Sequence, residues 1–128
     1  MSRHMHSSLA SGRWETLSLA EQMGNIGSEI SRVIRWKNKG NLKRMTRALD
    51  RALELIDLSI RWAQRSDIRQ IHPGAIRELC RLREVVCDCY LGENEYESDD
   101  VSMLRYFDQF CASKKRQRTG GIKESQHL

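Results

Sequence analysis

The apolar residues of this chain recur at helical spacing in four stretches, which are separated by polar or glycine-containing links. In the first stretch they follow one another at steps of three and four, starting at Leu19. Ser18 and Glu21 match a capping box, in which each side chain accepts a hydrogen bond from the other residue's backbone N–H. Gly40 is suited to end the helix because glycine adopts the left-handed conformation at little cost. The pattern therefore predicts a helix from Leu19 to about Lys39.

The second helix is expected to start after Asn41, whose side chain suits an N-cap, and to end near Ala63. Residues 64–72 are polar and are expected to form a connection. Pro73 fits the first turn of a third helix, since proline at that position loses no helical hydrogen bond. We expect this third helix to close at Leu91.

An acidic loop over residues 92–100 precedes the fourth helix, and the apolar pattern stops after Ser113. No stretch alternates with a period of two, so no strand is expected. Short links favour antiparallel neighbours, and the sequence therefore predicts an all-α fold, an up-down antiparallel four-helix bundle over residues 14–112. We expect residues 1–13 to form a flexible leader and residues 113–128 to form a disordered basic tail.

A stripe of small residues runs beside the apolar stripe of the first helix. Its members are Ala20, Gly24, Gly27 and Ser31. Glycine inside a helix costs about 1 kcal/mol relative to alanine. Two glycines on one face therefore predict that another backbone packs closely there.

Composition narrows the class of protein. Of the 128 residues, 39% are hydrophobic and 30% are charged, which is typical of a globular domain rather than of a disordered chain. The sequence contains no apolar run of about 18 residues and no apolar stretch typical of a secretory signal near its start, so we expect neither membrane partners nor export. We expect a cytoplasmic protein with reduced cysteines.

Little in the sequence indicates catalysis. Cys80, Cys87 and Cys89 share one helix at spacings that do not suit zinc, so we expect buried or half-buried thiols, no metal and no cofactor. Phosphate-binding glycine loops and nucleophile elbows are also missing, and we do not expect an enzyme. One spacing remains: Arg65 and His72 fit the loose Arg-x4-6-His pattern of helical HEPN ribonucleases, a degenerate pattern that we interpret as a chance match.

Basic residues gather around the link between the first two helices. From residue 32 to residue 51 the chain has eight basic residues and one acidic residue, a net charge of +7. Trp36 lies among them and is suited to stack on a base or ribose. We predict that this stretch binds nucleic acid, RNA rather than DNA, through Arg32, Arg35, Trp36, Lys37, Lys39, Lys43, Arg44, Arg47 and Arg51. The alternative is a solvated basic face with the tryptophan packed against a neighbour.

The opposite charge dominates between residues 84 and 108, with eight acidic residues and one basic residue, a net charge of −7. Charge asymmetry of this kind guides association rather than folding. A basic end and an acidic end on one small bundle would attract copies head to tail, into rings or filaments. The candidate docking residues are Glu93, Glu95, Tyr96, Glu97, Asp99 and Asp100. The alternative is a solvated loop.

Three stretches together resemble a family of small prokaryotic helical proteins. They are residues 22–30 (QMGNIGSEI) with 35–41 (RWKNKGN), residues 51–58 (RALELIDL), and residues 92–96 (GENEY) continuing to 106–110 (YFDQF). The resemblance spans Trp14 to Phe110 and implies a compact family domain, but it brings no activity. In architecture alone the chain is similar to small bundle proteins that accompany RNA-processing or reverse-transcription systems, some of which form basic rings.

Two hypotheses follow. The first is a non-enzymatic, oligomeric binding or adaptor module that contacts nucleic acid through its basic end. The second is a protein-interaction scaffold that assembles through complementary acidic and basic surfaces. A HEPN-like ribonuclease ranks last.

Overall fold

The computed structural model describes residues 12–110, and these residues are all-α, as the periodicity predicted. The elements in order are the 3-10 helix η1 (Arg13–Thr16) and the α-helices α2 (Leu19–Asn38), α3 (Leu42–Ala63), α4 (Ser66–Ile71) and α5 (Ala75–Tyr90). A last helix occupies residues 100–110. No strand occurs between residues 12 and 110. The basic tail expected over residues 113–128, and all but the end of the expected leader, lie outside the described residues.

Local signals placed the long helices correctly. The Ser18 hydroxyl accepts from the Glu21 N–H at 3.1 Å, and the Glu21 carboxylate accepts from the Ser18 N–H at 2.8 Å, which completes the predicted capping box. Gly40 has a φ of 72°, the left-handed conformation expected of it. The Asn41 side chain accepts from the backbone N–H of Arg44 and caps α3, also as predicted.

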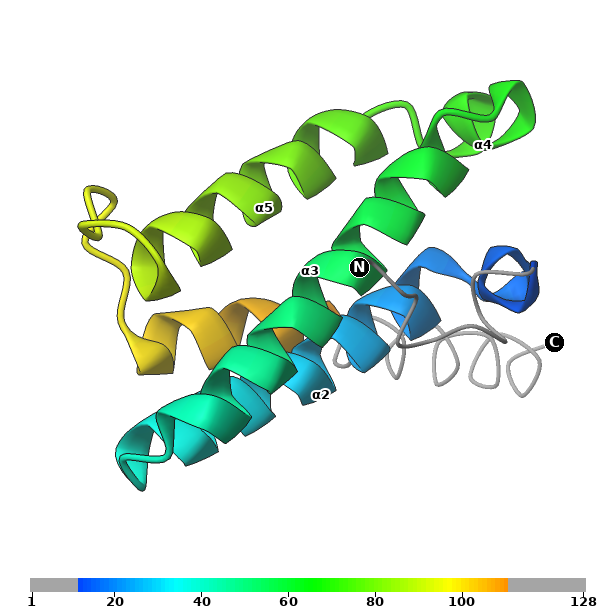
Figure 1. The fold of residues 1–128 in the computed structure, drawn as a ribbon. Helices are drawn as coiled ribbons and strands as arrows, with labels where there is room; N and C mark the ends of the chain where they lie inside the picture. The colour runs from blue at the N-terminus through cyan, green and yellow to red at the C-terminus, as the bar shows by residue number, and fades with distance from the viewer. Residues whose placement is uncertain (1–11, 111–128) are drawn as a thin grey trace, which may run out of the picture.

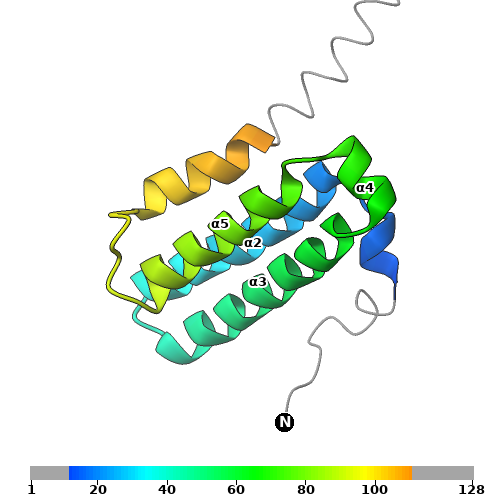
Figure 2. The ribbon, with the colours of Figure 1, turned by 90° about the horizontal axis from the view of Figure 1, so that it is seen from above.

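Consecutive long helices run in opposite directions (Figures 1 and 2). The last helix lies against both α2 and α5: Lys37 on α2 binds Asp100, and the Tyr106 hydroxyl donates to Glu78 on α5. The link between α2 and α3 and the segment between α5 and the last helix therefore lie at the same end of the molecule, which we call the hairpin end. The opposite end, with η1 and α4, is called the η1 end (Figure 2).

One apolar core joins all the long helices and includes the Trp14 side chain of η1. A chain of hydrogen bonds runs through the core at the η1 end. The Trp14 indole N–H donates to the Ser59 hydroxyl at 3.0 Å, and this hydroxyl donates to the Gln22 side-chain oxygen at 2.7 Å. The Gln22 amide in turn donates to the carbonyl of Leu17 at 3.2 Å. These buried polar groups therefore satisfy one another, as groups removed from water must.

The expected connection between α3 and α5 includes an element that the sequence did not indicate. It contains the short helix α4, whose Ile68 side chain packs against the core. Pro73 does not lie in the first turn of α5 but precedes its N-cap, Gly74. The Ala75 N–H donates to the His72 carbonyl at 3.1 Å, so proline occupies the second position of a tight turn, which suits its fixed φ.

The stripe of small residues on α2 makes only part of the predicted contact. A Cβ at Gly27 would lie 3.0 Å from the Phe107 side chain, so the last helix does approach closely there. The close neighbour is a side chain, however, and not a backbone. A Cβ at Gly24 would meet nothing within 4 Å, and the expectation of close packing at this glycine is wrong.

Among residues 12–110, no helix is both long enough and apolar enough to cross a bilayer.

Candidate nucleic-acid interface

The end of α2 and the start of α3 form an αα-hairpin that carries all nine residues predicted to bind nucleic acid. Three of the nine are engaged in ion pairs. Arg32 and Arg51 lie 3.2 Å and 3.4 Å from the carboxylate of Glu29, whose side chain is only 7% exposed. Lys37 lies 2.9 Å from the carboxylate of Asp100. Two carboxylates therefore compensate part of the charge of these three cations, and the pairs of Arg51 and Lys37 join α2 to α3 and to the last helix.

The remaining cations face solvent at the tip of the hairpin. They are exposed and make no ion pair with any other residue in the range 12–110. These are Arg35, Lys39, Lys43, Arg44 and Arg47. Together with Trp36 we call them the basic hairpin surface. The surface includes the first turn of the 22-residue helix α3, where the helix dipole also favours anions.

Trp36 organises part of this surface. Its side chain is half-buried, and the Lys39 ammonium and the Arg44 guanidinium lie 5.3 Å and 4.7 Å from its ring centroid. Both distances suit cation–π interactions. The ring therefore orients two of the five cations, a role that the sequence did not indicate.

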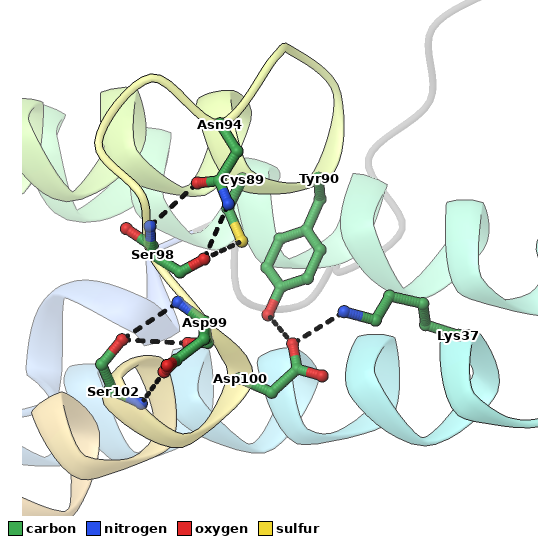
Figure 3. Close-up of polar contacts among 8 residues, drawn as sticks. All are labelled: Lys37, Cys89, Tyr90, Asn94, Ser98, Asp99, Asp100 and Ser102. Atoms are coloured by element: carbon green, nitrogen blue, oxygen red, sulfur yellow. Dashed lines mark hydrogen bonds and ion pairs between the residues drawn. The ribbon is translucent and has the colours of Figure 1, made fainter.

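The acidic segment between α5 and the last helix is a built structure rather than a loosely solvated loop (Figure 3). The Asp88 carboxylate accepts from the backbone N–H groups of Glu95 at 2.6 Å and Tyr96 at 3.0 Å. Asn94 and Ser98 exchange two hydrogen bonds of 2.8 Å and 2.9 Å. The segment therefore holds a defined shape without help from a partner.

The same figure shows how the last helix begins. The Asp99 carboxylate accepts from the backbone N–H of Ser102 at 2.7 Å, and the Ser102 hydroxyl accepts from the Asp99 N–H at 3.2 Å. The hydrogen bond from the Ser102 N–H, followed by the interaction with the Ser102 hydroxyl, lowers the pKa of the Asp99 carboxyl, so it remains charged. Of the six predicted docking residues, all but Asp100 are exposed.

Asp100 joins the acidic segment to the basic helix. Its carboxylate accepts from Lys37 at 2.9 Å and from the Tyr90 hydroxyl at 3.2 Å (Figure 3). Burial, followed by the nearby Cys89 and Asp100, raises the pKa of the Tyr90 phenol, which therefore stays protonated and donates. The acidic and basic clusters thus lie side by side at the hairpin end. This placement does not favour the head-to-tail contact between opposite ends that we expected from the sequence.

Both members of the HEPN-like pair already have other partners. The Arg65 guanidinium lies 2.8 Å from Asp67 and 3.6 Å from Glu15, and the hydrogen bond to Asp67 raises the pKa of Arg65. His72 packs its ring against Trp62, with 5.9 Å between ring centroids. The arginine is therefore engaged with carboxylates and not presented to a phosphate.

The cysteines differ partly from expectation. Cys87 and Cys89 are half-buried as predicted, whereas Cys80 is exposed because it lies on the outer face of α5. Burial raises the pKa of the Cys89 thiol. Within residues 12–110, no three His, Cys, Asp or Glu side chains converge as a metal site requires. Cys111, together with His4, His6 and His127, lies outside the described residues.

A groove between α5 and the last helix was not indicated by the sequence. It has a volume of about 660 Å³ and contains two arginines one helical turn apart, Arg77 and Arg81. In the sequence, only the four-residue spacing of these arginines pointed to this site. Such a spacing is common on helices and does not indicate a binding site unless the residues on the opposite side of the groove are known.

Comparison of the chain with protein families, with curated proteins and with solved structures finds no match. No activity is therefore transferred from a relative.

Proposed function

We propose that the protein is a non-enzymatic binding module that holds RNA by its phosphates through the basic hairpin surface. The observation that carries this proposal is the set of five exposed cations that make no ion pair within residues 12–110. Excess cations on a convex tip favour polyanions, because each phosphate contact releases a condensed counterion. In this proposal the four long helices act as a rigid up-down bundle that presents the tip.

RNA is favoured over duplex DNA by the shape of the surface. The cations are divided between two helices, two at the end of α2 and three at the start of α3, rather than all lying along a single helix that would enter a major groove. Proteins usually recognise RNA in loops and single strands, whose phosphates and bases are accessible from a convex tip. The half-buried Trp36 ring adds an aromatic surface beside the phosphate contacts.

The test is fluorescence anisotropy with a labelled single-stranded RNA of 12 nucleotides, at several salt concentrations. Five phosphate contacts predict that log K falls with log salt with a slope of about −3.5. The double variant Arg44→Glu/Arg47→Glu should lose binding at all salt concentrations, because it replaces two contacts by repulsion. Circular dichroism should show an unchanged helical content, since both side chains are exposed.

A matched control is available at the η1 end. Arg61 and Arg69 are also exposed and make no ion pair with other described residues. Arg61→Glu/Arg69→Glu changes the net charge by the same amount and should retain most of the affinity. Unchanged binding in the hairpin variant, or an equal loss in the control, would contradict a localised site.

A second candidate function is a protein-interaction scaffold. Three exposed apolar side chains, Leu42, Leu91 and Val101, belong to segments that meet at the hairpin end beside both charged clusters. Apolar side chains flanked by complementary charges are typical of protein contacts. Sedimentation without nucleic acid distinguishes the two functions: a salt-sensitive oligomer supports the scaffold, and a monomer at low salt excludes self-assembly.

A further inference from the structure

The groove between α5 and the last helix has the composition of a site for a small anionic ligand. It is lined by Gly74, Arg77, Glu78, Arg81, Leu82 and Val85 of α5 and its N-cap, and by Tyr96, Ser98, Ser102, Met103 and Tyr106 of the facing wall. Its volume of about 660 Å³ falls within the range of pockets that hold small molecules. The lining positions run from the N-cap Gly74 to Val85, eleven positions further along the chain, which corresponds to about 16 Å along the helix.

The positively charged side chains lie toward one part of the groove. Arg77 and Arg81 are exposed, lie one turn apart on the same face, and make no ion pair with another described residue. Gly74 is the N-cap of the 16-residue helix α5 and has no side chain to cap it. The backbone N–H groups of Ile76 and Arg77 consequently have no acceptor among residues 12–110. Two guanidiniums and a helix N-terminus together form an anion site.

The one carboxylate in the groove is already engaged. Glu78 accepts a hydrogen bond of 2.8 Å from the Tyr106 hydroxyl. Burial and this bond raise the pKa of the Tyr106 phenol, so it remains a donor at neutral pH. The bond turns the Glu78 charge toward the last helix, and it reduces the repulsion that an anion beside the arginines would meet.

The other part of the groove suits a planar ring. Its floor is formed by Leu82, Val85 and Met103, and Tyr96 stands at its edge with 54% of its surface exposed. The hydroxyls of Ser98 and Ser102 lie on the same wall. An apolar floor, an aromatic edge and a few hydroxyls are typical of sites for a flat heterocycle.

We propose that this groove binds a nucleotide, with its phosphate on Arg77 and Arg81 and its base over Leu82, Val85 and Met103 beside Tyr96. Charge disfavours the chain's own tail as the occupant, because residues 112–128 contain five basic residues and one acidic residue. The site lies on α5, the acidic segment and the last helix, not on the basic hairpin surface, and does not depend on the function proposed for that surface.

The test is calorimetric titration of the full chain with each of the four ribonucleoside 5′-monophosphates, with adenosine and with inorganic phosphate. At least one nucleotide should bind at least about tenfold more tightly than phosphate or the nucleoside, because only the nucleotide fills both parts of the groove. Arg77→Gln/Arg81→Gln should weaken this binding by at least about tenfold, since each charge-assisted contact has about that effect. Tyr96→Ala should weaken it less.

Two controls separate this proposal from RNA binding at the hairpin. Arg61→Gln/Arg69→Gln removes the same charge from the η1 end and should bind the nucleotide normally. Arg44→Glu/Arg47→Glu, which is expected to lose RNA, should also bind the nucleotide normally. The proposal is overturned if none of the four nucleotides binds, if the groove variant binds as tightly as the parent protein, or if phosphate alone binds as tightly as the nucleotides.

Discussion

The two ends of the molecule differ in where their polar side chains lie, inside the core at the η1 end and in water at the hairpin end. At the η1 end, Trp14, Ser59 and Gln22 form a closed chain of hydrogen bonds inside the core, and all three side chains are buried. At the hairpin end, charged side chains outnumber their partners and remain in water. Satisfied buried groups make a fold specific, whereas exposed excess charge contributes little to stability and much to association. The buried polar groups of the η1 end therefore contribute to the stability of the fold, whereas the exposed cations of the hairpin end are available for binding.

The largest expected effect on stability comes from Ser59→Ala, which breaks the buried chain of hydrogen bonds. This substitution leaves the Trp14 N–H without its acceptor and the Gln22 oxygen without its donor, and each such buried loss costs about 1–3 kcal/mol. We expect the free energy of unfolding, measured by urea denaturation, to fall by at least about 2 kcal/mol. RNA affinity of the folded fraction should not change, since the hairpin end does not contact Ser59.

Ser28→Ala is the matched control for this comparison. Ser28 lies on the exposed face of α2 and donates only to the carbonyl of Gly24. Its removal should alter the unfolding free energy by no more than about 0.5 kcal/mol. If both serine variants lower the unfolding free energy equally, the buried chain of hydrogen bonds does not contribute specially to the stability of the η1 end.

The sequence predicted elements whose signals are local and missed those that depend on distant contacts. The caps of α2 and α3 each join residues three positions apart, Ser18 with Glu21 and Asn41 with Arg44. Such interactions can be predicted from the local sequence alone. Helix α4 instead depends on Ile68 reaching a core assembled from other helices. Residues 64–72 do connect α3 to α5 as expected, but the short helix within them was not predicted for that reason.

The same limit applies to the candidate sites. The basic stretch was visible as composition, but which cations remain available depends on carboxylates elsewhere. Lys37 is paired with Asp100, 63 residues away, and Arg51 with Glu29, 22 residues away. The groove could not be predicted from the sequence, because composition alone does not show that α5 and the last helix pack next to each other.

An intermediate effect is expected from two glycines of α2 that differ only in their surroundings. In Gly27→Ala the new methyl group would lie 3.0 Å from Phe107, so Phe107 must move by a few tenths of an ångström, and overpacking of this kind costs about 1–3 kcal/mol. In Gly24→Ala nothing lies within 4 Å, and the better helix propensity of alanine should stabilise the protein by up to about 1 kcal/mol. Thermal unfolding should therefore shift in opposite directions for the two variants.

Opposite shifts in the unfolding temperature would show that α2 is tightly packed against the last helix at Gly27 and is not tightly packed at Gly24. Equal stabilisation by both alanines would mean that the last helix yields easily, and the shape of the groove that it helps to form would then be variable as well.

The smallest expected effect belongs to the link between the two charged clusters at the hairpin end. Asp100→Asn keeps an oxygen that accepts from Tyr90 but removes the charge that neutralises Lys37. Because this pair is partly exposed, the unfolding free energy should fall by only about 0.2–1 kcal/mol. RNA affinity should rise by about twofold at low salt, since one more cation becomes available, and this gain should disappear at high salt as screening increases.

Lys37→Gln gives the complementary measurement, because it breaks the same ion pair without releasing a cation and should not raise the affinity. If Asp100→Asn also leaves RNA affinity unchanged at low salt, Lys37 lies outside the RNA contact and the surface is limited to the five unpaired cations and Trp36.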